Sequence, residues 1–236
     1  RRAAAAGQAP HHARKPARSL DMNGVDTYFG APDSAINVID LQGQRRPGSA
    51  ADGEQYIEKN KAMLADWRRW FGNPNLPFYY VQLANWQAPN PDPAGGDGWA
   101  FMRDAQRKAL AIPHTGMAVA IDIGDAADIH PRNKVDVGDR LARWALRNDY
   151  GQDVVASGPL YKGLKVESSK AIVSFDHIGN GLMVGEKRGR APTVESANTP
   201  LRSFAIAGAD RKWYWAEAVI QDDGTVACTS PNVPAP

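Results

Sequence analysis

The stretch that decides the fold runs from residue 116 to residue 131 and reads Gly116-Met-Ala-Val-Ala-Ile-Asp-Ile-Gly-Asp-Ala-Ala-Asp-Ile-His-Pro131. Its first half, residues 116–123, is almost wholly apolar, which is typical of a strand buried on both faces of a parallel sheet. Its second half is an acidic loop that leaves the carboxyl end of that strand, where open α/β sheets place their functional sites. The stretch therefore predicts an α/β protein with a site in this loop.

Strand and helix patterns alternate around this stretch between residues 35 and 150. Alternation of this kind argues for a parallel sheet covered by helices. We expect further strands at 35–41 and 78–84, and helices at 55–70, 99–111 and 134–148. Asp52 is the expected N-cap of the first helix and Asn133 that of the third, while Tyr150-Gly151 marks the end of the third.

Two of these helices carry an apolar stripe with the spacing that packing on a sheet requires. In the first helix the stripe consists of Tyr56, Met63, Leu64, Trp67 and Phe71. In the third it consists of Val137, Leu141, Trp144 and Ala145. Both helices are therefore expected to lie against the sheet.

Beyond residue 151 the pattern changes to strands alone. We expect strands at 171–176, 181–184, 201–207, 213–220 and 225–230, with Asn180-Gly181 and Asp223-Gly224 as turn dipeptides. The sequence therefore divides into a disordered or non-native lead at 1–20, an α/β domain at 21–151 and an antiparallel β domain at 152–236.

Composition bounds the classes of partner. The chain has 236 residues, 43% of them hydrophobic and 23% charged, as in an ordinary globular protein. Its net charge of +2 owes much to basic residues at the start, so we expect no nucleic-acid partner. Cys228 is the only cysteine, which excludes an intrachain disulfide and a cysteine-rich zinc site. Because no stretch has the ~20 apolar residues of a membrane helix, we expect no membrane partner.

Asp128 and His130 are the candidate catalytic residues. In extended backbone, residues two apart project to the same side, so the Asp128 carboxylate can accept from Nδ1 and leave Nε2 basic. This is the base and its orienting partner in a Ser-His-Asp triad. The spacing alone also fits a solvated polar turn. A further alternative reads Asp122, Asp125, Asp128 and His130 as ligands of Mg, Ca or Mn, although no EF-hand spacing is present.

The surrounding sequence resembles the sialate O-acetylesterase family of SGNH serine hydrolases over roughly residues 52–236. The matching segments in the α/β region are Asp66-Trp-Arg68, Pro77-Phe-Tyr-Tyr-Val-Gln-Leu-Ala84, Arg103-Asp-Ala-Gln106, Ile112-Pro-His-Thr-Gly116, Ala120-Ile-Asp-Ile-Gly124, Asp128-Ile-His-Pro131 and Asn133-Lys134. Those in the β region are Gly158-Pro-Leu-Tyr161, Phe204-Ala-Ile-Ala-Gly-Ala-Asp210 and Lys212-Trp213.

The resemblance implies a partial three-layer α/β/α SGNH-hydrolase (flavodoxin-like) parallel sheet followed by a small antiparallel β domain. It implies deacetylation of acetylated carbohydrates through an acyl-enzyme, with His130 as general base and Asp128 as its orienting residue. Many SGNH enzymes place that carboxylate three residues before the histidine, where this chain has Ala127, so Asp125 is the fallback partner. The resemblance implies no cofactor, no metal and a periplasmic or secreted protein; the oligomeric state stays open.

The chain departs from the family at the nucleophile. The family's Gly-Gln-Ser-Asn motif is absent, and Gly7-Gln8-Ala9 has alanine in its place. Where the family has Trp-Tyr-Gln-Gly-Glu-Ser-Asn, residues 40–46 retain only Gln42 and Gly43, which we assign to substrate binding. Loss of the asparagine that donates to the oxyanion typically costs about 100- to 1000-fold in rate. Trp86 and the Gly95-Gly96 loop are expected to line the cleft.

Two functions follow from these observations. The first is a carbohydrate O-acetylesterase whose nucleophilic serine lies outside this chain. The alternative is a catalytically inactive hydrolase fragment that acts as a glycan- or partner-binding module. Trp213, Tyr214 and Trp215 are either a sugar-stacking platform or ordinary strand packing. His114 and His177 are interpreted as polar groups of a loop and of a strand end. Arg103 and Gln106 match the family, and the alternative is that they cap or brace the sheet from a helix face.

Overall fold

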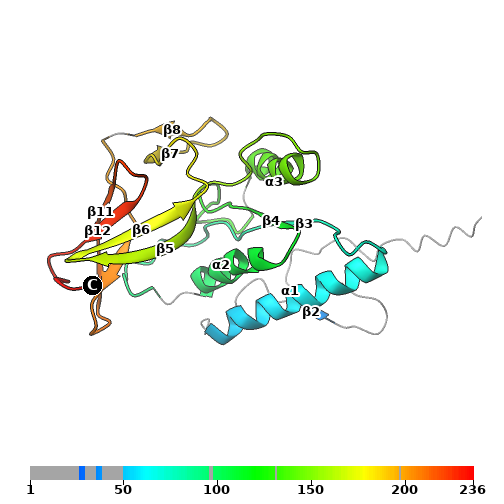
Figure 1. The fold of residues 1–236 in the computed structure, drawn as a ribbon, viewed down its shortest axis with the longest axis horizontal. Helices are drawn as coiled ribbons and strands as arrows, with labels where there is room; N and C mark the ends of the chain where they lie inside the picture. The colour runs from blue at the N-terminus through cyan, green and yellow to red at the C-terminus, as the bar shows by residue number, and fades with distance from the viewer. Residues whose placement is uncertain (1–26, 30–35, 39–49, 96–97, 131, 197) are drawn as a thin grey trace, which may run out of the picture.

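The computed structural model describes residues 27–29, 36–38, 50–95, 98–130, 132–196 and 198–236, which form a mixed α/β protein (Figure 1). Its helices are α1 (Ala50–Trp70), α2 (Gly98–Lys108), the 3-10 helix η1 (Ala109–Ala111) and α3 (Lys134–Asn148). Its first four strands are β1 (Thr27–Phe29), β2 (Ile36–Val38), β3 (Phe78–Val81) and β4 (Thr115–Ala118). The later strands are β5 (Leu160–Glu167), β6 (Lys170–Asp176), β7 (Gly185–Glu186), β8 (Val194–Glu195), β9 (Ala205–Ala207), β10 (Trp213–Trp215), β11 (Glu217–Ile220) and β12 (Val226–Thr229).

The parallel sheet of the described residues consists of β3 and β4, which pair in register from Phe78 opposite Thr115 to Val81 opposite Ala118. Helix α3 lies on one side of the sheet, and α1 and α2 lie on the other (Figure 1). The predicted α/β layering is therefore present in outline, around two strands. Its assignment to the SGNH class remains a prediction.

Helix α1 packs its apolar stripe against the sheet. Met63 and Leu64 are buried together with Ala109 and Ile112, and Phe78 and Tyr80 of β3 pack against this cluster. Trp67 meets Phe78 edge to face, with ring centroids 5.7 Å apart. The predicted stripe is thus correct except at its end, because Phe71 lies in the turn after the helix and is 66% exposed. The helix begins at Ala50, so Asp52 lies inside it and is not its N-cap.

Helix α3 has the bounds that the sequence predicted. The Asn133 side chain accepts from the N–H of Asp136, as expected of an N-cap. Gly151 has a φ of 65°, consistent with a helix terminus at this point. The helix end is also tied to the sheet, since the Tyr79 hydroxyl donates to the Asp149 carboxylate over 2.8 Å. Burial and this hydrogen bond raise the pKa of Tyr79 to about 12.

The indole of Trp144 lies directly on the backbone of β4. A Cβ added to Gly116 would stand 2.5 Å from Cδ2 of that ring. The ring is held in place because its Nε1 donates to the Met117 carbonyl over 2.9 Å. The glycine therefore sets how closely α3 approaches the sheet.

The remaining strands form antiparallel sheets. The largest has the order β11-β12-β6-β5, and β10-β9 and β7-β8 are two-stranded. The buried core of this region is formed by Ala171, Ile206, Ala218, Val226, Cys228 and Val233. The change from helices to strands falls where the sequence predicted it, while the division into domains stays a prediction. The Asp223-Gly224 turn joins β11 to β12, and Gly224 has a φ of 79°.

β5 is an edge strand of the four-stranded sheet. Leu164 and Val166, which are both exposed, lie on one face of it. The strand also carries two lysines. Lys162 pairs with Asp176 at 2.9 Å, and Lys165 pairs with Glu167 at 2.6 Å. The edge is therefore apolar in part but bordered by charge.

Several predicted strands differ in the structure. Residues 36–38, the described part of the strand expected at 35–41, pair antiparallel with β1 and not with the parallel sheet. A partner so close along the chain costs less loop-closure entropy than a crossover connection. The strand expected at 116–123 ends at Ala118, and the chain turns two residues later, where the N–H of Ile123 donates to the Ala120 carbonyl. The run at 213–220 divides at Ala216, whose N–H donates to the Phe204 carbonyl, so its halves join different sheets.

Three further differences concern individual strands and one helix. Residues 181–184 form no strand, and the neighbouring residues Gly185 and Glu186 pair with β8 instead. The strands β5 and β8 were not predicted. The helix at 99–111 ends in the 3-10 turn η1. No helix in the described part of the chain has both the length and the apolar character needed to cross a membrane.

Replacing Gly116 by alanine is expected to destabilise the protein. The new methyl group would overlap the hydrogen-bonded indole of Trp144, and overpacking of this kind costs about 1–3 kcal/mol. Urea unfolding would measure the loss. The matched control is Gly138→Ala on α3, where no atom lies within 4 Å of the added methyl group. This control should gain about 0.5–1 kcal/mol because alanine favours the helix. Equal behaviour of the two variants would contradict the packing account.

Candidate active site

Two loops lie side by side at the carboxyl end of the parallel sheet. One follows β3 and contains Asn85 and Gln87, and the other follows β4. The Asn85 side-chain oxygen accepts from the N–H of Gly124 over 2.8 Å. The N–H of Gln87 donates to the Ala126 carbonyl over 3.0 Å. A Cβ on Gly124 would overlap Asn85, so this glycine allows the two loops to meet.

The second loop brings Asp128 and His130 together. The Asp128 carboxylate oxygen Oδ1 accepts from the backbone N–H of His130 over 2.9 Å. The same oxygen lies 3.5 Å from Nδ1 of the imidazole. A carboxylate that accepts a hydrogen bond from the backbone N–H two residues further on forms an Asx turn. The prediction of extended backbone is therefore wrong, because the turn and not strand geometry places the ring beside the carboxylate.

The Asp128 carboxylate is ionised over a wide pH range. The hydrogen bond from the His130 backbone N–H holds the pKa of the Asp128 carboxyl below its ordinary value, and the positive charge of Arg132 acts in the same direction. The side chains of His130 and Asp128 are 44% and 37% exposed, so both reach solvent. The pair is thus a polar turn at the surface that also presents an imidazole next to a carboxylate.

Asp125 supports the loop and not the ring. Its carboxylate accepts from the N–H of Ala127 over 2.9 Å, and its carbonyl accepts from the N–H of Asp128 over 3.3 Å. Its contacts stabilise the turn that precedes His130. Between the two predicted partners, the structure therefore places Asp128 and not Asp125 next to the imidazole.

Asp122 is bound by α3. Arg140 donates from both terminal nitrogens to the two carboxylate oxygens, over 2.6 and 2.7 Å. Burial raises the pKa of Asp122, but the hydrogen bonds and charge of Arg140 outweigh it, so the pKa stays below its ordinary value. The clamp draws Asp122 toward the helix, and the described residues contain no group of three or more potential metal ligands. The set proposed from sequence as metal ligands is therefore not assembled.

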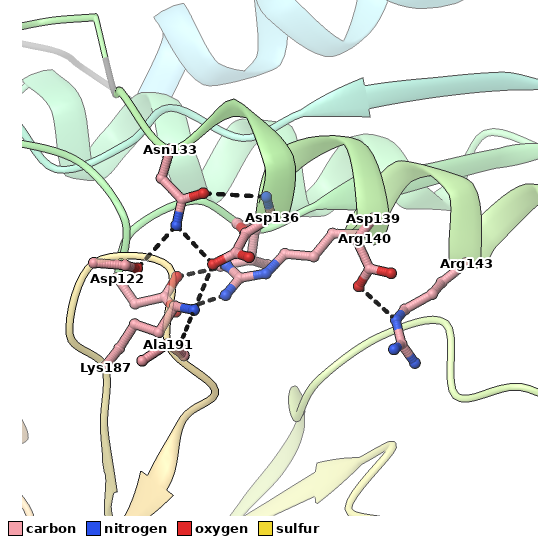
Figure 2. Close-up of polar contacts among 10 residues, drawn as sticks. Asp122, Asn133, Asp136, Asp139, Arg140, Arg143, Lys187 and Ala191 are labelled. Atoms are coloured by element: carbon pink, nitrogen blue, oxygen red, sulfur yellow. Dashed lines mark hydrogen bonds and ion pairs between the residues drawn. The ribbon is translucent and has the colours of Figure 1, made fainter.

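A second set of polar contacts ties the β7–β8 hairpin to this end of α3 (Figure 2). Lys187 Nζ lies 2.5 Å from the Asp136 carboxylate and donates to the Ala191 carbonyl over 2.6 Å. The Asn133 amide donates to the Gly189 carbonyl over 3.0 Å. Only 10% of the Lys187 side chain is exposed, so this ion pair lies largely out of solvent. The antiparallel region thereby buttresses the helix that holds Asp122.

Other predicted site residues have the following places. Trp86 follows β3 and meets Trp99 of α2 edge to face, with centroids 5.3 Å apart. Gln42, Gly43 and Gly96 lie outside the described residues. Gln106 is buried and braces the sheet, since its side-chain oxygen accepts from the N–H of Leu83 over 2.9 Å. The His114 carbonyl accepts from the N–H of Phe78, in keeping with a structural role for that loop.

Sequence reasoning missed the residues that hold the site in place. Asn85 and Arg140 make the contacts that fix the loop after β4, yet each lies far from it in sequence. A polar residue after a buried strand, as Asn85 is, gives a weak signal for such a role. For the pairing of Arg140 with Asp122 the sequence holds no signal, because it depends on the angle at which α3 crosses the sheet.

Replacing Asp122 by asparagine should lower the free energy of unfolding at pH 7 by about 1 kcal/mol, a modest value because the carboxylate is partly exposed. Since the folded-state pKa is depressed, the stabilisation is present above the unfolded pKa near 3.8 and is lost as the pH falls through the folded value. Urea unfolding between pH 7 and pH 2.5 should therefore show the two proteins converging. Asp139→Asn, which removes a surface pair with Arg143, is the control and should cost about 0.3–0.5 kcal/mol. A constant difference across this range would contradict the assignment.

Comparison with known proteins supports an esterase relationship. No protein-family model matches the sequence, and no curated protein matches it. The chain is similar to XAC1771, described as a novel carbohydrate acetylesterase from Xanthomonas citri, with a TM-score of 0.63 and 37% sequence identity. The match covers 77% of this chain and 39% of that one, so this chain corresponds to about two fifths of the solved protein. The loop with His130 and Asp128 thus belongs to a chain that is similar in fold, and at 37% sequence identity, to part of a carbohydrate acetylesterase.

Proposed function

We propose that this chain forms the acid–base part of a carbohydrate O-acetylesterase of the sialate O-acetylesterase type within the SGNH hydrolases. The observation that carries the proposal is the placement of the His130 imidazole beside the Asp128 carboxylate at the carboxyl end of β4. The similarity to a carbohydrate acetylesterase supplies the substrate class, an acetylated carbohydrate.

His130 acts as the general base in this proposal. Nδ1 is the ring nitrogen near Asp128, so Nε2 is the nitrogen that takes the proton from a serine hydroxyl. The serine oxygen bonds to the acetyl carbon, and the ester bond breaks as the protonated imidazole gives its proton to the sugar oxygen. Water, activated by the same imidazole, then releases acetate from the serine. Asp128 keeps the ring in the required tautomer and stabilises its positive charge.

The chain contains no Gly-Gln-Ser-Asn motif, the sequence in which the resembled family carries its nucleophile. We propose that the serine comes from sequence outside the chain. Gln42 and Gly43 are proposed to contact substrate, as is Trp86, which is fixed against Trp99 at the foot of the loop after β3. Reading the coding sequence upstream of Arg1 is the first test. A Gly-Gln-Ser-Asn motif there supports the enzyme, and an intervening stop codon in the same frame opposes it.

The second candidate function is an inactive hydrolase fragment that binds glycan or a partner. The observation that favours it is the 44% exposure of His130, because a general base in an assembled site is covered by substrate and protein. This reading expects no release of acetate from any ester under any condition, together with retained binding of saccharide.

Replacing His130 by alanine is the decisive test of the enzyme. With the protein of the full reading frame, kcat/KM for 4-nitrophenyl acetate and for acetylated sialic acid should fall at least about 100-fold, the usual contribution of a general base. Asp128→Asn should have a smaller effect, because water screens a partly exposed carboxylate. His177→Asn is the matched control, as asparagine tolerates the φ of 60° found there and should leave the rate unchanged. Equal rates for His130→Ala and the unaltered protein would rule out the base.

A further inference from the structure

The two-stranded sheet of β9 and β10 has two unlike faces. Tyr214 stands opposite Ile206, which is buried in the core of the antiparallel region. Trp213 and Trp215 point to the other face, where they are 45% and 50% exposed. Alternation along a strand explains the difference, since residues two apart share a face. The sequence left this Trp-Tyr-Trp run open between strand packing and a stacking platform. Tyr214 belongs to the packing, and both tryptophans lie outside it.

The cross-strand neighbours of the two tryptophans are both alanines, which cover little of an indole ring. Trp213 stands opposite Ala207, and Trp215 stands opposite Ala205. Opposite residues in an antiparallel pair are the side chains that pack on each other. Because a methyl group covers little of an indole, this face carries two adjoining aromatic surfaces with small residues beside them. About half of each tryptophan is thus exposed to a ligand.

Trp215 is held in a defined orientation. Its Nε1 donates to the Pro91 carbonyl over 3.2 Å. Pro91 belongs to the loop that leaves the carboxyl end of β3 and leads to α2, the same loop that carries Trp86 at its start. The aromatic face is therefore fixed to a loop that begins beside the proposed active site. A fixed ring loses little entropy when a ligand stacks on it.

Polar side chains border the aromatic face at the turn before β10. Asp210, Arg211 and Lys212 are all exposed. The Asp210 carboxylate accepts from the N–H of Lys212 over 3.1 Å, whereas the Lys212 ammonium lies 5.3 Å from the centre of the Tyr214 ring and so belongs to the opposite face from the tryptophans. An apolar, flat centre next to a turn of exposed charged residues suits a ligand whose own faces are apolar and whose rim carries hydroxyl groups.

We propose that Trp213 and Trp215 form a stacking subsite for sugar rings, and hence that the substrate is an oligosaccharide or polysaccharide that extends beyond the acetylated sugar. The inference rests on the proposed function for the chemical class of the ligand. A pyranose ring presents C–H groups on its faces and hydroxyl groups at its rim, which matches the quadrupole of an indole face. Residues two apart in a strand are separated by roughly 7 Å, which lets the two indoles take neighbouring sugar rings.

Binding of polysaccharide tests the subsite without any need for turnover. In a His130→Ala background, native affinity electrophoresis in acetylated xylan, deacetylated xylan and acetylated glucomannan should show retardation by at least one polymer. Trp213→Ala and Trp215→Ala should each weaken that binding about 3- to 10-fold, the usual size of an aromatic contact. Trp215→Phe keeps a ring and loses the bond to Pro91, so it should retain most of the binding. Unchanged binding in the double alanine variant would overturn the proposal.

The matched control is Trp70→Ala, because Trp70 is 71% exposed at the end of α1 and on a different part of the molecule. Equal weakening by this variant would show that the polymer adheres to any exposed tryptophan and would overturn the subsite. Size-exclusion chromatography tests whether a second copy of the chain occupies this face instead of a sugar. A protein that is oligomeric, and that becomes monomeric in the double variant with no change in polymer binding, would show that the face joins two copies of the chain.

The outcome is separable from that of the catalytic proposal. If the subsite is correct, the double variant made in the otherwise unaltered protein should hydrolyse 4-nitrophenyl acetate at the normal rate and show a raised KM for acetylated polymer. If the unaltered protein has no esterase activity but the double variant loses polymer binding, the subsite is supported and only the catalytic proposal is rejected. Normal hydrolysis of acetylated polymer by the double variant, with normal KM, leaves the chemistry intact and removes the subsite.

Discussion

The ion pair between Asp122 and Arg140 fixes the point at which the chain leaves the parallel sheet. Arg140 binds the carboxylate with two hydrogen bonds and also donates to the Val119 carbonyl over 2.6 Å. These bonds hold the segment after Ala118 against α3 on both sides of its turn, in which the N–H of Ile123 donates to the Ala120 carbonyl. The loop that follows is then laid against Asn85 and ends at His130. The position of the imidazole thus depends on a contact with α3 made eight residues earlier in the chain.

The sequence predicted those features that are set by local pattern. Helix α3 has the expected bounds because its cap, its apolar stripe and its terminal glycine all lie within or beside the helix. The alternation of helix and strand gave the α/β layering for the same reason. The end of β4 and the pairing of β2 were predicted wrongly, because each depends on a partner that the local pattern does not specify: Arg140 in one case and β1 in the other.

The candidate site shows the same division. The nearness of Asp128 and His130 was predicted, but from strand geometry, whereas the structure achieves it with a side chain that bonds to the backbone two residues on. A spacing of two residues brings the side chains together in an extended strand and also in an Asx turn. The two residues are therefore close although the backbone geometry differs from the prediction. The roles of Asn85, Arg140 and Lys187 were not predicted, because they arise from tertiary packing. Gln42 and Gly43 lie outside the described residues, so the substrate-contacting end of the site remains a prediction.

The edge strand β5 bears on how the protein behaves at high concentration. A strand with unpaired backbone groups and apolar side chains is a template on which another chain can extend the sheet. Leu164 and Val166 are the apolar side chains of that template, and the charged side chains of Lys162 and, on the opposite face, Lys165 repel a like-charged edge. Each lysine is partly neutralised by its carboxylate partner, so the repulsion is incomplete. Protection against fibril-like self-assembly at this edge therefore comes from a few surface charges, and raised ionic strength weakens it.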